Sequence, residues 1–200
     1  VTSSVVKPGD VRYKDINGPN GVPDGVINSF DRQFLGSSLD HYTYGGQLNM
    51  NYKGLDFGLT FQGVAKNNFV FTRDLILPNP EVENQTKEFD GNFWSVYNTP
   101  QQNLDAKYPR MSIVSNSNNY RFSDYWLMDG SYLKIKSLTL GYSLSQDAVN
   151  RTPFSKVRLY ATGTDLFRFD NLPKGVDPEQ TNGSSYYLTK TAVFGIQLNF

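Results

Sequence analysis

Apolar and polar residues alternate along two neighbouring stretches of the chain, residues 43–52 and 55–65. In the first stretch one parity is apolar or aromatic and the other carries amides: Tyr44, Leu48, Met50 and Tyr52 against Gln47, Asn49 and Asn51. The second stretch repeats the pattern, with an apolar parity of Leu55, Phe57, Leu59 and Phe61. A period of two is that of a β-strand, and the intervening Lys53 and Gly54 suit a tight turn. The pattern therefore predicts a β-hairpin over residues 43–65.

Three further stretches alternate in the same way: residues 131–145, 156–169 and 191–200. Their apolar parities carry, in turn, Leu138, Leu140, Tyr142 and Leu144; Val157, Leu159 and Ala161; and Ala192, Phe194, Ile196, Leu198 and Phe200. Lys134 and Lys136 share the apolar parity of the first of these stretches. A lysine that faces lipid at the membrane midplane costs about 2–4 kcal/mol. In a membrane-spanning sheet, we therefore expect both lysines to lie beyond the hydrocarbon region.

Two long stretches have no sustained period. Residues 1–36 are rich in Gly, Asn, Asp and Pro, and residues 67–130 contain both tryptophans and several prolines. No stretch has a convincing helical period. Strands of about 9–11 residues joined by tight turns and long loops are typical of an outer-membrane β-barrel. The expected fold is all-β: the last five or so strands of an antiparallel transmembrane β-barrel, with long extracellular loops.

A soluble antiparallel β-sandwich is the alternative, because its strands alternate too. The barrel is favoured by aromatic residues near the strand ends on the apolar parities: Tyr44, Tyr52, Tyr142, Phe194 and Phe200. The opposite parities consist mainly of Asn, Gln, Thr and Gly, which suit a wet lumen. In the alternative, the chain would be a soluble extracellular glycan-binding module stabilised by calcium.

Composition adds mainly exclusions. The 19 basic residues balance the 19 acidic ones, so there is no positive excess to attract nucleic acid. Mean hydropathy is −0.49, which a barrel tolerates because its strands are polar on one side. Cysteine is absent, which excludes disulfides and thiolate metal sites. The single histidine, His41, has no catalytic framework, and the carboxylates Asp177 and Glu179 lie in a proline-containing turn, so we expect no enzyme.

Residues 123–142, SDYWLMDGSYLKIKSLTLGY, resemble the C-terminal region of SusC/RagA-like TonB-dependent transporters of Bacteroidetes outer membranes. Further pieces similar to this family occur in the expected order: 8–15 (PGDVRYKD), 24–32 (DGVINSFDR), 44–46, 52–57, 61–63, 108–110, 156–160, 175–179 and 194–200. The resemblance covers nearly the whole chain.

The resemblance implies part of an energy-coupled importer in the cell outer membrane, a plugged barrel of about 22 strands. Such transporters take up oligosaccharides or peptides together with a SusD-like surface lipoprotein. Residues 1–42 would be a loop with a candidate calcium-binding turn, 43–65 a hairpin, 66–130 a long extracellular loop, and 131–200 the last three strands. The plug and the segment that contacts the TonB complex would lie upstream. Because the chain begins at Val1 without a visible signal peptide, we expect a fragment or a processed product.

Residues 15–31, DINGPNGVPDGVINSFD, contain oxygen-bearing side chains at the alternating spacing of an EF-hand or dockerin calcium loop. The candidate ligands are Asp15, Asn17, Asp24, the carbonyl of Val26, Asn28 and Asp31. An insertion with two prolines separates Asn17 from Asp24, and the last ligand is Asp rather than Glu. The alternative is an Asp/Asn/Gly turn without metal. Calcium, if bound, would be structural, and no other cofactor is expected.

The loop 66–130 is rich in aromatic residues that could stack on sugar rings or pack as loop core and lipoprotein interface. The candidate residues for a ligand or partner are Trp94, Tyr97, Tyr108, Arg110 and Trp126. We expect Trp126 in the aromatic belt at the membrane interface. The last stretch, with Phe194, Ile196, Leu198 and Phe200, resembles the signal read by the barrel-assembly machinery, and is equally the closing strand of a sheet.

Overall fold

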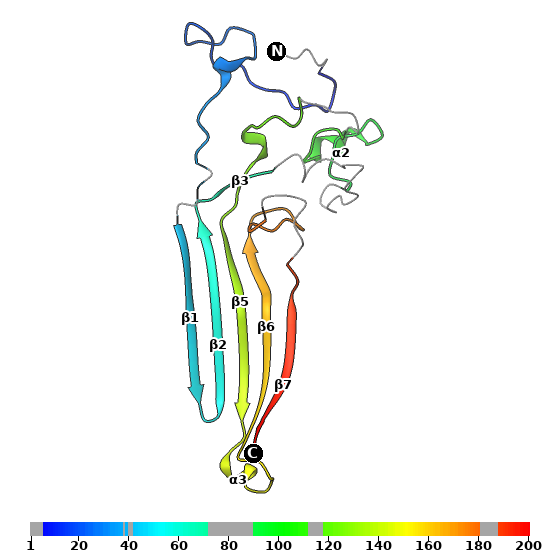
Figure 1. Cartoon of the computed structure of the whole chain (residues 1–200). Coiled ribbons are helices and arrows are strands. Elements are labelled where there is room, and N and C mark those ends of the chain that lie inside the picture. The colour runs from blue at the N-terminus through cyan, green and yellow to red at the C-terminus, as the bar shows by residue number, and fades with distance from the viewer. Residues whose placement is uncertain (1–5, 38, 40–41, 72–89, 112–117, 181–187) are drawn as a thin grey trace. The chain divides into compact units, whose positions relative to one another are not determined.

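A computed structural model describes residues 6–37, 39, 42–71, 90–111, 118–180 and 188–200 (Figure 1). Five strands form one antiparallel sheet in the order β1-β2-β5-β6-β7. Their bounds are β1 (Tyr42–Tyr52), β2 (Leu55–Ala65), β5 (Tyr132–Ser143), β6 (Lys156–Asp170) and β7 (Thr191–Asn199). The short strands β3 (Asn68–Val70) and β4 (Leu127–Asp129) pair separately. The all-β antiparallel prediction is confirmed, and the described strands form an open sheet rather than a closed barrel.

The helices are short. They are the 3-10 turns η1 (Ser29–Asp31) and η2 (Asp124–Trp126) and the α-helices α2 (Pro100–Asp105) and α3 (Gln146–Val149). Among the described residues, none of these is long and apolar enough to cross a membrane. The chain divides into two compact units. The loop unit comprises residues 1–37, 69–128 and 172–185, and the sheet unit comprises residues 38–68, 129–171 and 186–200.

The hairpin of the sheet unit has the register that alternation predicts. Tyr52 faces Leu55, and the turn residues Lys53 and Gly54 have φ values of 46° and 86°. Positive φ at both central positions is what a type I′ turn requires, and this turn matches the twist of the flanking strands. In Figure 1 this turn, helix α3 and the C-terminus lie at the same end of the sheet.

The sheet contains one irregularity that the sequence pattern does not reveal. Between β5 and β6 the register shifts, so that Ile135 pairs with Phe167 and Ser137 with Thr164. Lys136 is thus displaced from the ladder, and Asp165 has a φ of 50°. Such a β-bulge resets the alternation of the strand. The prediction that Lys134 shares the apolar face is therefore wrong: it pairs with Gln62 on the polar face and is 2% exposed, with its ammonium 4.0 Å from Asp165.

One face of the sheet is apolar across all five strands. Leu48 pairs with Leu59, Leu59 with Leu138, Leu140 with Ala161, and Ala161 with Phe194. Much of this face is exposed, as shown by Leu140 at 55% and Phe194 at 82%.

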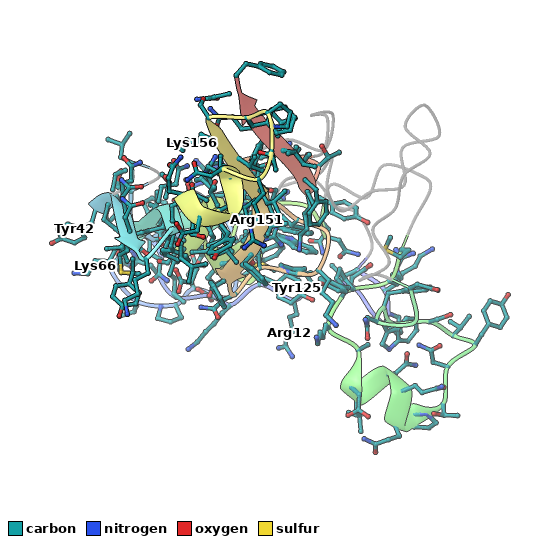
Figure 2. All side chains as sticks on the ribbon, turned by 90° about the horizontal axis from the view of Figure 1, so that it is seen from below. Arg12, Tyr42, Lys66, Tyr125, Arg151 and Lys156 are labelled. Carbon is teal, nitrogen blue, oxygen red and sulfur yellow. The ribbon has the colours of Figure 1, made fainter. Side chains whose placement is uncertain are left out.

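The hairpin carries a tyrosine–lysine pair near each end. Lys53 lies 5.3 Å from the ring centroid of Tyr52. Lys66 lies 5.4 Å from that of Tyr42, and Figure 2 labels this second pair.

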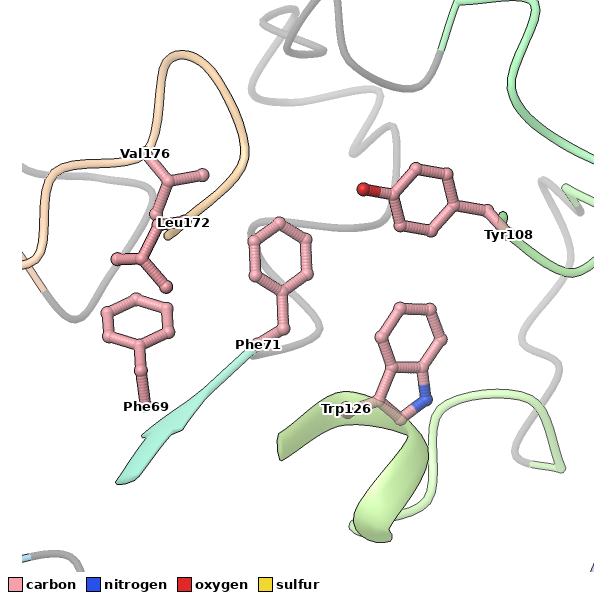
Figure 3. Packing of buried hydrophobic residues seen from close by; sticks show 6 residues of the cluster. All are labelled: Phe69, Phe71, Tyr108, Trp126, Leu172 and Val176. Atoms are coloured by element: carbon pink, nitrogen blue, oxygen red, sulfur yellow. The ribbon is translucent and has the colours of Figure 1, made fainter. Parts of the chain in front are cut away.

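The loop unit has a small core of its own, made of Phe69, Phe71, Tyr108, Trp126, Leu172 and Val176 (Figure 3). Trp126 is 2% exposed, and its ring is nearly parallel to those of Phe71 and Tyr108, with centroid distances of 6.3 and 6.4 Å. Its indole N–H donates to the carbonyl of Asn119 at 2.8 Å. The expectation that Trp126 belongs to a membrane-interface belt is wrong, because the ring is buried in protein.

Candidate functional site

The polar face of the sheet carries a hollow of about 390 Å³. The amides that line it come from β1, the hydroxyls from β2 and β5, and an ion pair from β2 and β6. The polar side chains are Gln47, Asn49, Asn51, Asp56, Thr60, Ser137, Thr139 and Arg158. Because Asp56 and Arg158 neutralise each other, the hollow offers mostly uncharged hydrogen-bonding groups. Such a wall can bind hydroxyl or amide groups, and its described residues include no nucleophile paired with a base.

The predicted calcium loop is folded around Asp31. Its carboxylate accepts backbone N–H groups from Asn28 at 2.7 Å, Ile16 at 2.9 Å and Asn17 at 3.2 Å. Asn28 caps η1 through its side-chain oxygen, which accepts from Phe30 N at 2.8 Å. The hydrogen bonds, that of Asn28 first, hold the pKa of Asp31 below its usual value. Asp31 thus behaves as the centre of a capping network.

The other candidate ligands lie in the same loop. Asp15 accepts the backbone N–H of Gly25 through Oδ2, and Asp24 accepts that of Val26 at 2.9 Å. The second oxygen of Asp15, Oδ1, is buried without a hydrogen-bond partner. The described residues nevertheless bring together no group of three or more His, Asp or Glu side chains able to hold a metal. Calcium binding at Asp15, Asn17, Asp24, Val26, Asn28 and Asp31 stays a prediction.

A buried asparagine fixes the segment before this loop. Asn119, fully buried, accepts the N–H of Val11 at 2.9 Å and donates to Asp10 Oδ1 at 2.9 Å. Arg110 pairs with the same carboxylate at 2.6 Å. Burial alone would raise the pKa of Asp10, but hydrogen bonds from Lys7, Arg110 and Asn119 outweigh it and lower the pKa. Sequence reasoning missed this site, since residues 10 and 119 are far apart in the chain.

The five aromatic-loop candidates fall into two environments. Tyr108 and Trp126 are buried in the loop-unit core, and Arg110 is held by Asp10. Trp94 packs against Gly9, where an added Cβ would overlap the indole ring. Only Tyr97 among these five is highly exposed, at 95%. Val96 and Leu104 of the same segment are also exposed, and the sequence pattern did not single them out.

The predicted assembly row lies on the apolar face of β7. Leu198 pairs with Val157, Ile196 with Leu159 and Phe194 with Ala161. Phe200 follows the strand and contacts Phe154 edge to face, with ring centroids 5.3 Å apart. His41 lies outside the described residues. Glu179 donates its backbone N–H to Asp177 at 3.0 Å, which makes this carboxylate pair part of a turn.

Comparisons with known proteins identify the relatives of this chain. No family model matches the sequence. TonB-dependent receptor P3 of Formosa agariphila is 30% identical over 172 residues, which cover 86% of this chain and 16% of that receptor. TonB-dependent receptor SusC of Bacteroides thetaiotaomicron is 28% identical over 199 residues, which cover 97% of this chain and 18% of SusC. The resemblance to SusC/RagA-like TonB-dependent receptors is thereby confirmed.

Solved structures agree at the level of the fold. The RagAB peptide importer in its closed-closed state matches with a TM-score of 0.60 and 21% identity, covering 92% of this chain and 20% of the matched chain. The open-open state matches with a TM-score of 0.59 and 20% identity, covering 91% of this chain and 20% of the matched chain. The open sheet is therefore built like part of a SusC/RagA-like barrel.

This chain spans only about a sixth of the length of the curated TonB-dependent receptors that it matches. Those relatives are named as receptors and not as enzymes, in agreement with the sequence analysis. The aromatic loop, the acidic loop and the polar hollow are thus features of a SusC/RagA-like segment.

Proposed function

We propose that this chain forms five strands of the barrel of an outer-membrane TonB-dependent importer for oligosaccharides or peptides. The observation that carries the proposal is the two-sided sheet. One face is apolar and exposed from β1 to β7, and the other carries amides, hydroxyls and a neutralised ion pair. Lipid outside and a wet lumen inside stabilise both faces at once.

The ends of the hairpin support this orientation. Tyr42 with Lys66 and Tyr52 with Lys53 bracket the apolar residues of β1, as aromatic and snorkelling residues do at the two membrane interfaces. A strand of 11 residues is long enough to cross the hydrocarbon when tilted. The rival β-sandwich would cover the apolar face with a second sheet, and the described residues form no such layer.

The membrane proposal is tested by fractionating cells that make the full chain. The protein should sediment with the outer membrane, resist extraction by high salt and carbonate, and dissolve in detergent as a folded species. Recovery of a folded, monomeric protein in buffer without detergent would overturn the proposal. The matched relatives named as receptors support this location.

We propose further that the loop unit contacts a SusD-like lipoprotein through Val96, Tyr97 and Leu104. These side chains are exposed at 74%, 95% and 79%. An exposed tyrosine beside aliphatic groups is the kind of anchor that fills an apolar pocket on a protein partner. The solved structures with a similar fold are of the RagAB peptide importer, and the name RagAB joins two components. This supports a second component beside the barrel here.

The segment that carries Val96, Tyr97 and Leu104 is held by its own hydrogen bonds, so that little conformational entropy is lost when a partner binds. Asn103 accepts the N–H of Ser95 at 3.0 Å and donates to its carbonyl at 2.9 Å. Asn98 donates to the carbonyl of Phe93 at 2.9 Å. Thr99 and Gln102 form a capping box at the start of α2.

Co-purification tests this contact. In the full chain, Tyr97→Ala should lower the amount of lipoprotein that co-purifies in detergent by roughly tenfold, the loss expected of an aromatic anchor. Phe34→Ala is the matched control, because Phe34 is also highly exposed but lies in another segment. Equal recovery of the lipoprotein with both variants would remove Tyr97 from the interface.

A TonB complex would act through segments that lie outside this chain.

The transported solute would pass the polar face of the sheet, whose amides and hydroxyls suit the hydroxyls of oligosaccharides and the backbone of peptides equally. Uptake measured with labelled oligosaccharides and labelled peptides in cells carrying or lacking the full gene separates these two classes. If the gene deletion changes neither uptake, the importer proposal fails.

We propose that Phe194, Ile196, Leu198 and Phe200 serve as the signal for the barrel-assembly machinery. Support comes from the unbroken apolar row on β7 and the aromatic contact of Phe200 with Phe154. Replacing Phe200 by Ser in the full chain should lower the amount of folded protein in the outer membrane. Unchanged assembly would overturn this role.

A structural calcium ion in the loop 15–31 is the last part of the proposal. It is supported by the unpartnered Oδ1 of Asp15 and by the acidic and amide side chains that the loop gathers. Addition of calcium to chelated protein should slow amide exchange at Gly25 and Val26 in the wild type and leave Asp15→Asn unchanged. No change in the wild type would show that the loop is a metal-free turn.

A further inference from the structure

Three side chains lie flat on the polar face of the sheet and connect four of its strands. Arg158 of β6 reaches past β5 to Asp56 of β2, where its Nε donates to Asp56 Oδ1 at 2.8 Å and its Nη2 to Oδ2. The strand between them contributes Gly141, whose register partners are Asp56 and Tyr160. A Cβ at Gly141 would overlap both carboxylate oxygens and the guanidinium. The ion pair therefore requires glycine at this position.

The same arrangement continues toward β7. The guanidinium carbon of Arg158 lies 5.1 Å from the ring centroid of Tyr160, a cation–π distance. The Tyr160 ring lies over Gly195, its register partner on β7. A Cβ at Gly195 would overlap Cζ, Cε1 and the hydroxyl oxygen of Tyr160. We call Asp56, Arg158 and Tyr160, lying over Gly141 and Gly195, the side-chain belt.

Alternation alone leaves the register of β7 unsettled. A slip by one residue would place Phe194 and Ile196 on the polar face, so the apolar pattern prevents it. A slip by two residues keeps every apolar side chain on its own face. Among the described strands β7 pairs only with β6, so within this sheet its contacts with β6 must distinguish the registers.

The belt distinguishes the registers that alternation cannot. The polar parity of β7 contains one glycine, Gly195, between Val193 and Gln197. A two-residue slip in either direction would bring Val193 or Gln197 beneath the Tyr160 ring, where their Cβ atoms meet the overlap that Gly195 avoids. Arg158, anchored on Asp56, keeps the ring pressed on the strand. We propose that the side-chain belt is the register lock of strand β7.

Engineered cysteines can read the register directly, because this chain has none of its own. Thr162 faces Val193, so cysteines at these two positions report the native register. Cysteines at Thr162 and Thr191 report a slip that brings Val193 under the ring, and cysteines at Thr164 and Val193 report the opposite slip. Directly facing cysteines are close enough for a disulfide, and diagonal ones lie mostly beyond reach.

In the full chain assembled in its membrane, only the facing pair should cross-link. Gly195→Ala should lower the ratio of facing to offset cross-links roughly tenfold, because overpacking a tight contact commonly shifts an equilibrium by that much. Gly58→Ala is the matched control, since Gly58 is also a strand glycine of this sheet. Its added Cβ would make only ordinary contacts, at 3.4 Å from Asn49 and 3.8 Å from Thr139.

A second background keeps the test decisive if Gly195→Ala prevents folding. In Tyr160→Ala the ring is absent, so adding Gly195→Ala should change neither the cross-link ratio nor the amount of folded protein further. Recovery of folded protein in the double variant, to the level of Tyr160→Ala alone, supports the lock. If Gly195→Ala behaves like Gly58→Ala, or is as harmful without Tyr160 as with it, the belt does not set the register.

Discussion

The loop unit and the sheet unit treat their aromatic residues in opposite ways. Trp126 is 2% exposed at the centre of the loop-unit core, whereas Phe194 on the sheet is 82% exposed. The burial of polar residues also differs between the two units. Asn119 is fully buried in the loop unit, while the amides of β1 line an open hollow. The loop unit is thus organised as a protein in water, and the sheet unit has the two faces that the proposed position between lipid and water requires.

This difference teaches that one chain can follow two rules of burial. The loop unit hides apolar area in its own interior and satisfies buried polar groups with hydrogen bonds. The sheet unit leaves apolar area outside, where lipid would cover it, and satisfies its backbone through the strand ladder. Substitutions of the same chemical kind should therefore have opposite effects in the two units.

The largest effect is expected from Trp126→Ala. Removing a buried tryptophan costs about 3–5 kcal/mol, and the ring contacts of Phe71 and Tyr108 are lost with it. Hydrogen exchange should accelerate across the loop unit, including the Phe71 amide, which donates to the Trp126 carbonyl. Tyr97→Ala, which removes an exposed aromatic residue from the same unit, should leave exchange unchanged. Slow exchange in both variants would contradict the separate core.

Leu140→Lys should break the sheet unit only if lipid covers it. Leu140 is 55% exposed, so a sheet in water would accept lysine easily. Against lipid near the midplane the same change costs about 2–4 kcal/mol. Thr139→Lys is the control, because Thr139 lies on the polar face and hydrogen-bonds Thr162 at 3.0 Å. Denaturant midpoints of both variants of the full chain in bilayers decide, and equal midpoints would place water on both faces.

Asn119→Ala tests the buried polar hub of the loop unit. It leaves the N–H of Val11 unpaired and takes one donor from Asp10, a loss of about 1–3 kcal/mol. Segment 7–13 should loosen, which faster exchange at Arg110 would show, since its amide donates to Gly9. Asn118→Ala removes the hydrogen bonds of a half-buried amide to Val11 and Asn119 and should have a smaller effect. The reverse order would assign the hub to Asn118.

The smallest effect concerns the pH dependence of the acidic loop. Because the folded state lowers the pKa of Asp31, its contribution to stability is present above the ordinary carboxyl value of 3.8 and is lost as the pH falls through the lowered pKa. The amides of Asn28, Ile16 and Asn17 should therefore exchange faster in this acid range. Asp31→Asn should abolish the pH dependence, whereas its persistence would assign it to another carboxyl group.

Much of the sheet could be predicted because its pattern is local. Strand β2 has the expected bounds, and β1 begins one residue earlier than expected. Period two reports which face a residue occupies without knowledge of its neighbours. The start of helix α2 also has a local signal in the sequence. Thr99 followed by Pro100, with Gln102 at the third position, is a capping box.

The hub and the belt could not be predicted, because both depend on pairing across the chain. Asp10 meets Asn119, and Asp56 meets Arg158, only after the chain has folded. A glycine in a strand indicates a bulge or a close approach, but not which residue approaches it. Gly195 and Gly58 look alike in sequence, and only the register shows that a ring lies over the first.

The bulge at Lys136 reverses which residues of β5 face the apolar side of the sheet. From Leu138 to Tyr142 the even-numbered residues of β5 face the apolar side, whereas at Leu133 and Ile135 the odd-numbered ones do. Opposite it, β6 has two extra residues, Asp165 and Leu166, so its alternation is unchanged and Phe167 and Phe169 face the apolar side as Leu159 and Ala161 do. Accessibility labelling along β5 must therefore be interpreted with opposite parities on the two sides of Lys136, whereas β6 keeps one parity throughout. Deleting Lys136 alone should restore a single parity along β5.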